Sequence, residues 1–490
     1  MRFGCLYVPN LPLQALWRVE PTLLGEAVAV ARGEGARASV VAVSPAARAA
    51  GVRPGARLKE ALALCPELVL RWEDPAVLEA AREAVLDAAA AVAPKVEEVR
   101  PGLVLVDTQG LDKLHGGDRG LASALLSAAR KLGLEGRAAV ASGKRVAQIA
   151  ALRGEGLEVV PRGEERAFLA PLPIEALGAE PALVETLARW GVATAGALAA
   201  LPEHGLASRL GPEGLRLWRL AQGRDDEPLV PRELPVVFEE GCDLDHEITA
   251  MEGLLFLLRP ALERLTARLA CRGFSCGGLL LRLALDPGGE ALLPVEVAAP
   301  TRDVPTLLAL CRSILERRPP DAPVRGVRLR AEAAGARIEQ LRLFGLPTVS
   351  PDRLATVVAK VAAIVGDDRL GSPVPEDSHL HEDVRLERFD PPPAEEEAAA
   401  EPAPPVLALR LFRPPLPAEV RMASGLPQAV SARGVNGWVV SLSGPWRVDV
   451  GWHDAPVRRD GFDVELSDGA VYRLAHDRLR GQWFLLGRYD

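Results

Sequence analysis

The sequence predicts a multidomain protein that combines α/β and α+β domains and carries a small β domain at its C-terminal end. A chain of 490 residues is too long for one core, and roughly 150 residues per domain gives about three to four domains. Strand-like runs alternate with Ala- and Leu-rich helical runs over residues 1–165, and short alternating runs rich in tryptophan occupy residues 406–490. A hydrophobic content of 48% is sufficient to build these cores.

The first segment is predicted to be an α/β domain, and the two segments after it are predicted to be helical and α+β. The strand-like runs of residues 1–165 are Phe3–Val8, Ala27–Ala31, Val40–Val43, Leu103–Val106 and Ala138–Ala141. Residues 166–235 are mostly helical. Residues 236–345 alternate a helix, a Gly-flanked strand, a second helix and a strand, at Gly253–Arg272, Gly277–Leu285, Val304–Arg318 and Gly326–Ala333.

A helix and an acidic, proline-rich linker are expected over residues 346–405. The helix is predicted at Pro351–Ile364. Residues 371–405 hold ten acids and two arginines, which accounts for the whole net charge of −8, so this stretch is expected to be an extended tether. Beyond it, residues 406–490 carry Trp438, Trp446, Trp452 and Trp483 within strand-like runs. Val464–Leu474 reads as a hairpin with an Asp-Gly turn.

Composition argues against several classes of protein. No run of 18 apolar residues is present, so we expect no membrane span and a cytoplasmic protein. The six cysteines contain no CxxC pair, and no His cluster has zinc-ligand spacing, so reduced thiols and no metal or other cofactor are expected.

Three motifs then point to one family. Residues 96–107 read VEEVRPGLVLVD, which resembles the VEExSIDEAxLD stretch of Y-family DNA polymerases. Residues 44–55 with Leu64–Leu68 resemble the SYEAR…LCPDL fingers segment, and residues 141–150 resemble the palm helix that runs into AKIA. These matches are collinear over roughly the first 345 residues. The chain is therefore similar to the Y family, and specifically to its ImuB branch.

The resemblance implies a domain order. It implies palm and fingers over residues 1–165, with fingers at about 20–75, a helix-hairpin-helix thumb over residues 166–235, and an α+β little finger over residues 236–345. The linker of residues 346–405 and the β domain of residues 406–490 follow.

The catalytic acids of the family have no counterpart in this chain. Two-metal phosphoryl transfer needs carboxylates that hold ions about 4 Å apart. The family positions of these acids are occupied here by Val8, Asn10, Gly102 and Leu103. We therefore expect a pseudo-polymerase without catalytic residues. The alternative is a weakly active translesion DNA polymerase that uses displaced acids such as Asp107, Glu97 or Glu98.

Two cations match family positions that contact the incoming triphosphate. Arg48 and Lys144 stand there, so residual nucleotide binding is one reading. The other reading is that both are ordinary surface charges.

DNA binding is expected from two regions, without sequence preference. Gly178, Thr194 and Gly196 belong to the hairpin-like thumb segment, whose helix N-terminus would favour a phosphate; a plain helical turn is the alternative, because Glu180 stands where the family prefers glycine. Residues 251–345 hold fourteen arginines and ten acids, so their surface either faces phosphates or is a mixed-charge helical surface. The arginines expected to contact phosphates are Arg317, Arg318, Arg325, Arg328 and Arg330.

Residues 340–344 read QLRLF, which resembles the short motif by which bacterial polymerases dock on the β sliding clamp. Gln340, Leu341, Leu343 and Phe344 are the expected clamp-binding residues, and the last strand of the little finger is the alternative reading. By resemblance, the chain is expected to be a non-catalytic adaptor in damage-induced translesion synthesis. It would link the clamp to an error-prone C-family DNA polymerase and a RecA-like ImuA-type protein. A third reading is a stand-alone DNA-binding protein.

Overall fold

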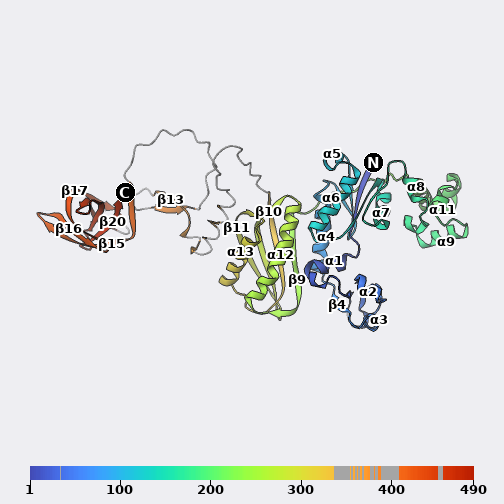
Figure 1. The fold of residues 1–490 in the computed structure, drawn as a ribbon, viewed down its shortest axis with the longest axis horizontal. Helices are drawn as coiled ribbons and strands as arrows, with labels where there is room; N and C mark the ends of the chain where they lie inside the picture. The colour runs from blue at the N-terminus through green and yellow to red at the C-terminus, as the bar shows by residue number, and fades with distance from the viewer. Residues whose placement is uncertain are drawn as a thin grey trace. The chain divides into compact units, whose positions relative to one another are not determined.

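The computed structural model describes residues 1–335 except Glu34, individual residues and short stretches between 354 and 387, and residues 408–490 except 451–455. The chain divides into two compact units, Met1–Ala363 and Ile364–Asp490. Figure 1 labels their elements. The expected fold class, a mixed α/β and α+β multidomain chain with a C-terminal β domain, is confirmed.

A five-stranded sheet with the order β5-β6-β1-β7-β8 forms the part that we call the palm. Its strands are β1 (Arg2–Tyr7), β5 (Val96–Arg100), β6 (Leu103–Asp107), β7 (Arg137–Ser142) and β8 (Leu157–Val159). The central strand β1 runs antiparallel to both β6 and β7. Along β1 and into the loop after it, Leu6 and Val8 join one core cluster while Phe3 and Cys5 join the other, as the period of two along a strand requires.

Helices cover both faces of the palm sheet. The Leu6 face packs against α4 (Pro75–Ala90) and α6 (Asp118–Lys131), and the Phe3 face packs against α7 (Lys144–Arg153). A short helix, α5 (Asp112–His115), precedes α6. Because both faces are covered, the three central strands β1, β6 and β7 are largely apolar and buried, as the strand-like runs of the sequence predicted, whereas the edge strand β5 carries Glu97 and Glu98.

A smaller sheet with the order β3-β2-β4 forms the fingers. Its strands are β2 (Val28–Arg32), β3 (Ser39–Val43) and β4 (Val69–Trp72), and its helices are α2 (Pro45–Ala49) and α3 (Leu58–Leu64), with short 3-10 turns η1 (Pro21–Leu23) and η2 (Gly35–Arg37). Helix α1 (Leu11–Val19) follows β1 and packs both on α4 of the palm and on β2 and β3. Ser44 caps α2 by accepting from the N–H of Ala47 at 3.2 Å.

The thumb is helical, as predicted. It comprises α8 (Glu165–Leu169), η3 (Ile174–Leu177), α9 (Pro181–Arg189), α10 (Ala195–Ala199) and α11 (Glu203–Ala221). Helix α11 is broken at Gly211, which precedes Pro212. The thumb shares the core cluster on the Phe3 face of the palm sheet.

The little finger is a four-stranded antiparallel sheet with the order β11-β10-β12-β9, against which two helices pack. Its elements are β9 (Val237–Ile248), α12 (Met251–Cys271), β10 (Phe274–Leu285), β11 (Glu290–Thr301), α13 (Val304–Arg317) and β12 (Val324–Gly335). The sequence analysis identified the two helices, β10 and β12, but not β9 or β11. Strand β11 contains Pro294 and Pro300, which is compatible with a strand only at an edge of the sheet, where β11 lies.

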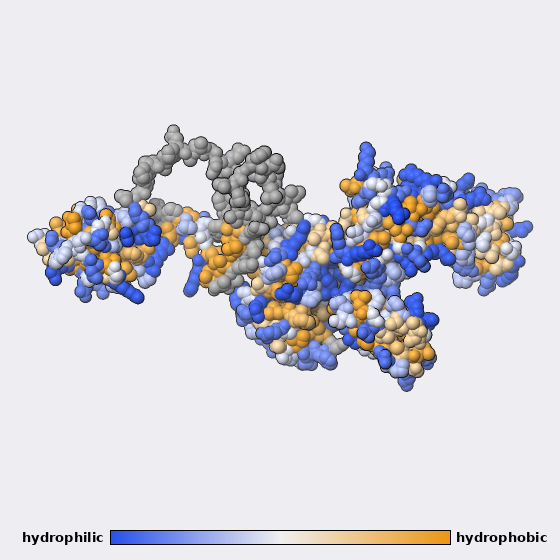
Figure 2. Space-filling view, viewed as in Figure 1, coloured by the Kyte–Doolittle hydropathy of each residue, from blue (hydrophilic) through white to orange (hydrophobic). Residues whose placement is uncertain are grey.

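The second unit contains a closed barrel of six strands joined in sequence order. The strands are β15 (Leu409–Ala423), β16 (Leu426–Ala432), β17 (Val435–Val450), β18 (Val457–Leu466), β19 (Val471–Asp477) and β20 (Gln482–Tyr489); a separate pair is formed by β13 (Ser372–Pro375) and β14 (Val384–Glu387). The predicted hairpin joins β18 to β19 through Asp468 and Gly469. Trp438 is 59% exposed and Val440 is 66% exposed. Hydrophobic and hydrophilic residues are interspersed on the barrel face seen in Figure 2.

Candidate functional site

A tight turn joins β5 to β6 at the end of the palm sheet. Arg100 pairs with Leu103, so Pro101 and Gly102 form the loop. Proline followed by glycine with a φ of 80° is typical of a type II turn. A Cβ atom on Gly102 would lie 2.8 Å from the carbonyl oxygen of Val8, whose N–H donates to the carbonyl of Gly102 at 2.7 Å. The turn therefore leaves no room for a side chain at residue 102.

The other three residues expected to stand at the family's acid positions have buried or backbone-bound side chains. Val8 is 1% exposed and Leu103 is 2% exposed, and they pack into the two core clusters on opposite faces of the palm sheet. Asn10 adopts a left-handed backbone conformation at the start of α1, and its Nδ2 donates to the carbonyl of Val43 at 2.9 Å. This hydrogen bond connects the palm to strand β3 of the fingers.

Lys144 is buried in an ion-pair cluster. Its Nζ lies 2.8 Å from Glu97 Oε1 and 3.3 Å from Glu227 Oε1, and it donates to the carbonyl of Pro228 at 2.8 Å. The residue is only 1% exposed. The other oxygen of Glu97 accepts from the N–H of Val230 at 2.7 Å. The ammonium therefore fastens the segment that follows the thumb to the edge of the palm, whereas Arg48, the other predicted nucleotide contact, is exposed on α2.

The remaining acids near the turn are also paired. Glu98 accepts from Arg82 Nε at 2.5 Å and from the guanidinium of Arg232. Burial alone would raise the pKa of Glu98, but the hydrogen bond and charge of Arg82, together with Arg232, hold that pKa below its usual value. Asp107 lies 3.2 Å from Lys95 Nζ and accepts from the N–H of Gln109 at 2.9 Å.

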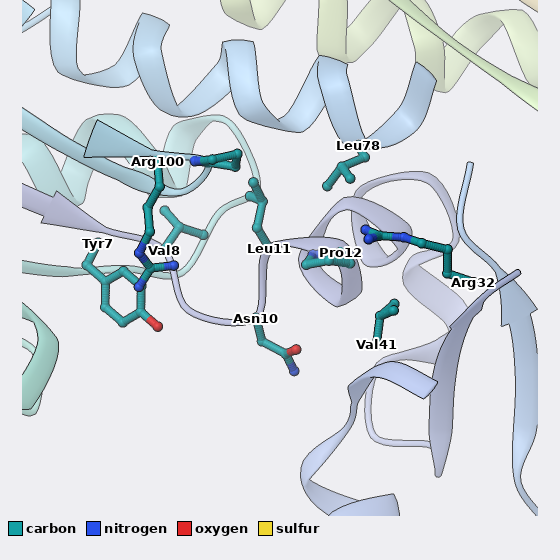
Figure 3. A pocket seen from close by; sticks show the side chains of 10 residues that line it. Tyr7, Val8, Asn10, Leu11, Pro12, Arg32, Val41, Leu78 and Arg100 are labelled. Atoms are coloured by element: carbon teal, nitrogen blue, oxygen red, sulfur yellow. The ribbon is translucent and has the colours of Figure 1, made fainter. Parts of the chain in front are cut away.

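A cavity of about 280 Å³ lies beside the turn, between the palm and the fingers (Figure 3). Its lining residues are Tyr7, Val8, Asn10, Leu11, Pro12, Arg32, Val41, Leu78, Arg100 and Pro101. This lining contains two arginines and no acidic side chain. Figure 3 shows the Arg100 side chain alongside Tyr7, and its guanidinium lies 5.5 Å from the centre of the Tyr7 ring. The sequence analysis did not predict a role for Arg100, although this cation lies two residues before Gly102.

In the thumb, the three predicted phosphate-binding residues also hold the local structure together. Gly178 ends η3 in a left-handed conformation. Thr194 caps α10 by accepting from the N–H of Ala197 at 3.2 Å, and Gly196 donates its N–H to the carbonyl of Ala170 at 3.0 Å. Glu180 is exposed at the N-terminus of α9, so its carboxylate stands next to the N–H groups that a phosphate would need.

The predicted DNA-binding arginines of the little finger differ in exposure and in whether a carboxylate pairs with them. Arg317 and Arg318 are exposed at the end of α13, and Arg330 is exposed on β12. Arg325 is paired with Asp286 at 2.9 Å, and Arg328 is paired with Asp243 at 3.0 Å.

Other arginines of the same domain face the palm. Arg268 Nε of α12 lies 2.7 Å from Asp87 Oδ2 of α4, and Arg264 Nε lies 3.1 Å from Glu240 of β9. Arg18 of α1 reaches Glu240 at 3.0 Å. Some of the arginines in residues 251–345 therefore form ion pairs inside the protein and are not available to bind phosphates. An acid within the apolar run of α4, Asp87, is the feature of the sequence from which this interface could have been predicted.

Two further observations concern the described part of the chain. Among these residues, no group of three or more His, Cys, Asp or Glu side chains is arranged to hold a metal ion. None of their helices combines the length and the apolarity needed to cross a membrane. The predicted helix at Pro351–Ile364 and the clamp motif Gln340–Phe344 lie largely or wholly outside the described residues.

The chain is similar to known proteins over most of its length. The model of the impB/mucB/samB family matches residues 6–152. Protein ImuB of Caulobacter vibrioides (strain NA1000 / CB15N) is 29% identical over 461 residues, which cover 90% of this chain and 100% of that protein. DNA polymerase IV 2 of Mesorhizobium japonicum is 30% identical over 322 residues, 65% of this chain and 71% of that protein. The crystal structure of DinB from Sulfolobus solfataricus aligns with a TM-score of 0.42 and 17% identity, covering 68% of this chain and 99% of that one.

Proposed function

Because the chain belongs to the impB/mucB/samB family and, within it, to the ImuB branch, we propose that it is a non-catalytic, Y-family-like adaptor in translesion DNA synthesis. The single observation that carries this proposal is the Pro101-Gly102 turn. By the resemblance of residues 96–107 to the family motif, this turn corresponds to the paired metal-binding acids, and its geometry leaves no room for a side chain at residue 102. With Leu103 buried, neither position of the pair presents an oxygen ligand for Mg²⁺.

The alternative, a weakly active polymerase that uses displaced acids, receives less support. Glu97, Glu98 and Asp107 would each have to leave a cation that now binds its carboxylate. For Glu98 that partner is Arg82, at 2.5 Å, with Arg232 as a second one. Breaking these pairs costs free energy that metal binding would have to supply. None of the three acids lines the cavity beside the turn.

DNA is the first proposed partner. Arg317, Arg318 and Arg330 are exposed, as is Gly178 in the thumb, and these are the residues proposed to contact phosphates. Such contacts carry no sequence information, so we expect binding without sequence preference and an affinity that falls steeply with salt. Glu180 and the internal pairing of Arg325 and Arg328 predict a moderate affinity.

The other proposed partners are proteins. We propose that Gln340, Leu341, Leu343 and Phe344 dock on the β sliding clamp, with Leu343 and Phe344 as the apolar anchors. An error-prone C-family polymerase and a RecA-like ImuA-type protein complete the proposed assembly in the cytoplasm, in a response to DNA damage. The C-terminal barrel, with Trp438 and Val440 exposed, is the proposed docking platform for these two partners.

The experiment that tests this function combines clamp binding with primer extension on one preparation. The wild-type chain is titrated against its own sliding clamp beside the triple variant Gln340→Ala, Leu343→Ala, Phe344→Ala. Arg342→Ala, at the variable position of the motif, is the matched control. We expect binding by the wild type and the control, loss of binding in the triple variant, and no primer extension with Mg²⁺ or Mn²⁺ by any of them.

Two outcomes would contradict the proposal. Primer extension by the wild type would support the polymerase alternative. Equal clamp affinity of the wild type and the triple variant would support a stand-alone DNA-binding protein.

A further inference from the structure

The cavity beside the Pro101-Gly102 turn has the opposite charge from a metal site. Its lining contains Arg32 and Arg100 and no acid. A cation site needs oxygen ligands with negative charge, whereas a positively charged site selects anions. The lining of this cavity therefore favours an anionic ligand and not a metal cation.

The two arginines of the cavity are not equivalent. Arg32 Nε and Nη2 lie 2.5 and 2.7 Å from the two carboxylate oxygens of Glu73, a bidentate pair that neutralises the guanidinium. For Arg100, the described residues provide no carboxylate partner; its guanidinium lies over the Tyr7 ring. An aromatic face orients a guanidinium without using its N–H donors, so the donors of Arg100 remain available to a ligand.

The surrounding cations are engaged elsewhere. Lys144 is buried between Glu97 and Glu227 and does not line the cavity. Arg2 at the start of the central strand is held by Asp118 and Glu165. Within the described palm, Arg100 is therefore the cation that the cavity presents to solvent, with the hydroxyl of Tyr7 and the amide of Asn10 as further polar groups of the lining.

We propose that this cavity binds a phosphate group directly through Arg100, without a divalent metal ion. The guanidinium fork matches the geometry of phosphate oxygens. A cavity of about 280 Å³ is at the lower limit of ligand sites, which are about 300–1,000 Å³, so it suits a phosphate or pyrophosphate moiety. The phosphate comes either from a nucleoside triphosphate or from the end of a DNA strand.

A direct arginine contact has a consequence that a metal site does not share. Mg²⁺ bound to a triphosphate screens its charge and occupies its oxygens, so it competes with Arg100. Affinity should therefore be higher in EDTA than in millimolar Mg²⁺. A site that binds the nucleotide through metal ions would show the reverse order. The inference rests on the proposed loss of the metal site and on no protein partner.

The test is a calorimetric titration of the full chain with three probes: dATP, inorganic pyrophosphate, and a primer–template duplex with or without a 5′-phosphate. Each is run in EDTA and in Mg²⁺. We expect Arg100→Gln to weaken phosphate binding about tenfold or more, as for loss of a charge-assisted hydrogen bond. Arg153→Ala, an exposed palm arginine outside the cavity, is the matched control and should change nothing.

A second variant tests the site through an expected increase in phosphate affinity. Glu73→Gln removes the carboxylate that neutralises Arg32, which gives the cavity a second free guanidinium. We expect phosphate affinity to rise in this variant, a result that misfolding would not produce. Binding of dATP and pyrophosphate alone would assign the site to a nucleotide, and a preference for the 5′-phosphorylated duplex would assign it to a strand end; either supports the proposal.

The proposal is overturned if Arg100→Gln leaves the affinity for every probe unchanged, or if binding requires Mg²⁺. Primer extension on the same preparation separates the two possible failures. No extension together with unchanged Arg100→Gln binding refutes the phosphate site alone. Extension together with Mg²⁺-dependent binding refutes the non-catalytic function as well.

Discussion

Arg268 of the little finger and Asp87 of the palm form an ion pair at 2.7 Å, and each side chain is only 2% exposed. A pair at this depth needs further hydrogen bonds, because removing two charges from water costs several kcal/mol per ion. Arg268 also donates to the carbonyl of Glu239 at 2.9 Å. Arg272 lies 3.5 Å from the second oxygen of Asp87. The little finger is thus attached to the palm through charges that have no access to water.

Removing one partner of this pair should destabilise the chain strongly. Asp87→Ala leaves Arg268 buried without its carboxylate, and we expect a loss of about 3–5 kcal/mol in the free energy of unfolding, measured by denaturant titration. Arg312→Ala, which removes an exposed pair with Glu316, is the control and should cost less than about 0.5 kcal/mol. Equal effects of the two variants would mean that the palm interface does not form in solution.

The acid in the same interface predicts a pH dependence. Burial alone would raise the pKa of Glu240, but the charges of Arg18, Arg268 and Arg264 and the hydrogen bond from Arg18 lower it to about 2. Because the folded pKa lies below the unfolded one, the stabilisation by Glu240 is complete above about pH 4.5 and is lost as pH falls toward 2. The difference in melting temperature between wild type and Glu240→Gln should therefore be constant above about pH 5 and should shrink as pH falls from 4.5 to 3. Melting curves that stay parallel would contradict the assignment.

The Pro101-Gly102 turn predicts that an acidic side chain introduced at residue 102 would be destabilising. Gly102→Asp should destabilise the chain by about 1–3 kcal/mol, because the residue has a φ of 80° and its Cβ would lie 2.8 Å from the Val8 carbonyl oxygen. Gly110→Asp is the matched control, since Gly110 has a φ of 81° and open space around it. The difference between the two melts isolates the contact. A Gly102→Asp variant as stable as Gly110→Asp would show that the turn rearranges freely.

Lys144 is predicted to serve stability and not nucleotide binding. Lys144→Met leaves Glu97 without its ammonium and releases the segment at Glu227 and Pro228, so we expect a loss of about 1–3 kcal/mol and faster proteolysis in that segment. Lys95→Met should cost at most about 1 kcal/mol, because the Lys95 side chain is 57% exposed beside Asp107. A loss of dATP binding in Lys144→Met without a loss of stability would contradict this role.

The ion pairing of the little-finger arginines predicts which of them contribute to the salt dependence of DNA binding. Arg330 is exposed and has no carboxylate partner among the described residues, so Arg330→Ala should reduce the slope of log affinity against log salt by about 1. Arg325→Ala should change the slope less, because Asp286 already neutralises that guanidinium. Fluorescence anisotropy with a labelled duplex at several salt concentrations measures both. Identical slopes for all three proteins would exclude this sheet as a phosphate contact.

Much of the architecture could be predicted from local patterns. Continuous apolar runs marked β1, β6 and β7, and an Asp-Gly turn marked the hairpin of β18 and β19, because strand periodicity and turn conformations depend on neighbouring residues. Strand β9 was missed, since its run of acids, glycine and histidine has low strand propensity and only its pairing with β12 makes it a strand.

The sequence by itself determined that Val8, Gly102 and Leu103, none of which has a side-chain oxygen, stand at the positions where the resemblance predicts metal-binding acids. Only the tertiary structure decided which charged side chains form ion pairs with each other. Lys144 meets Glu227, and Arg268 meets Asp87, across 83 and 181 positions of the chain. Only the fold brings such groups together, and burial then decides whether a charge is neutralised by a partner or, as at Arg100, left available to a ligand.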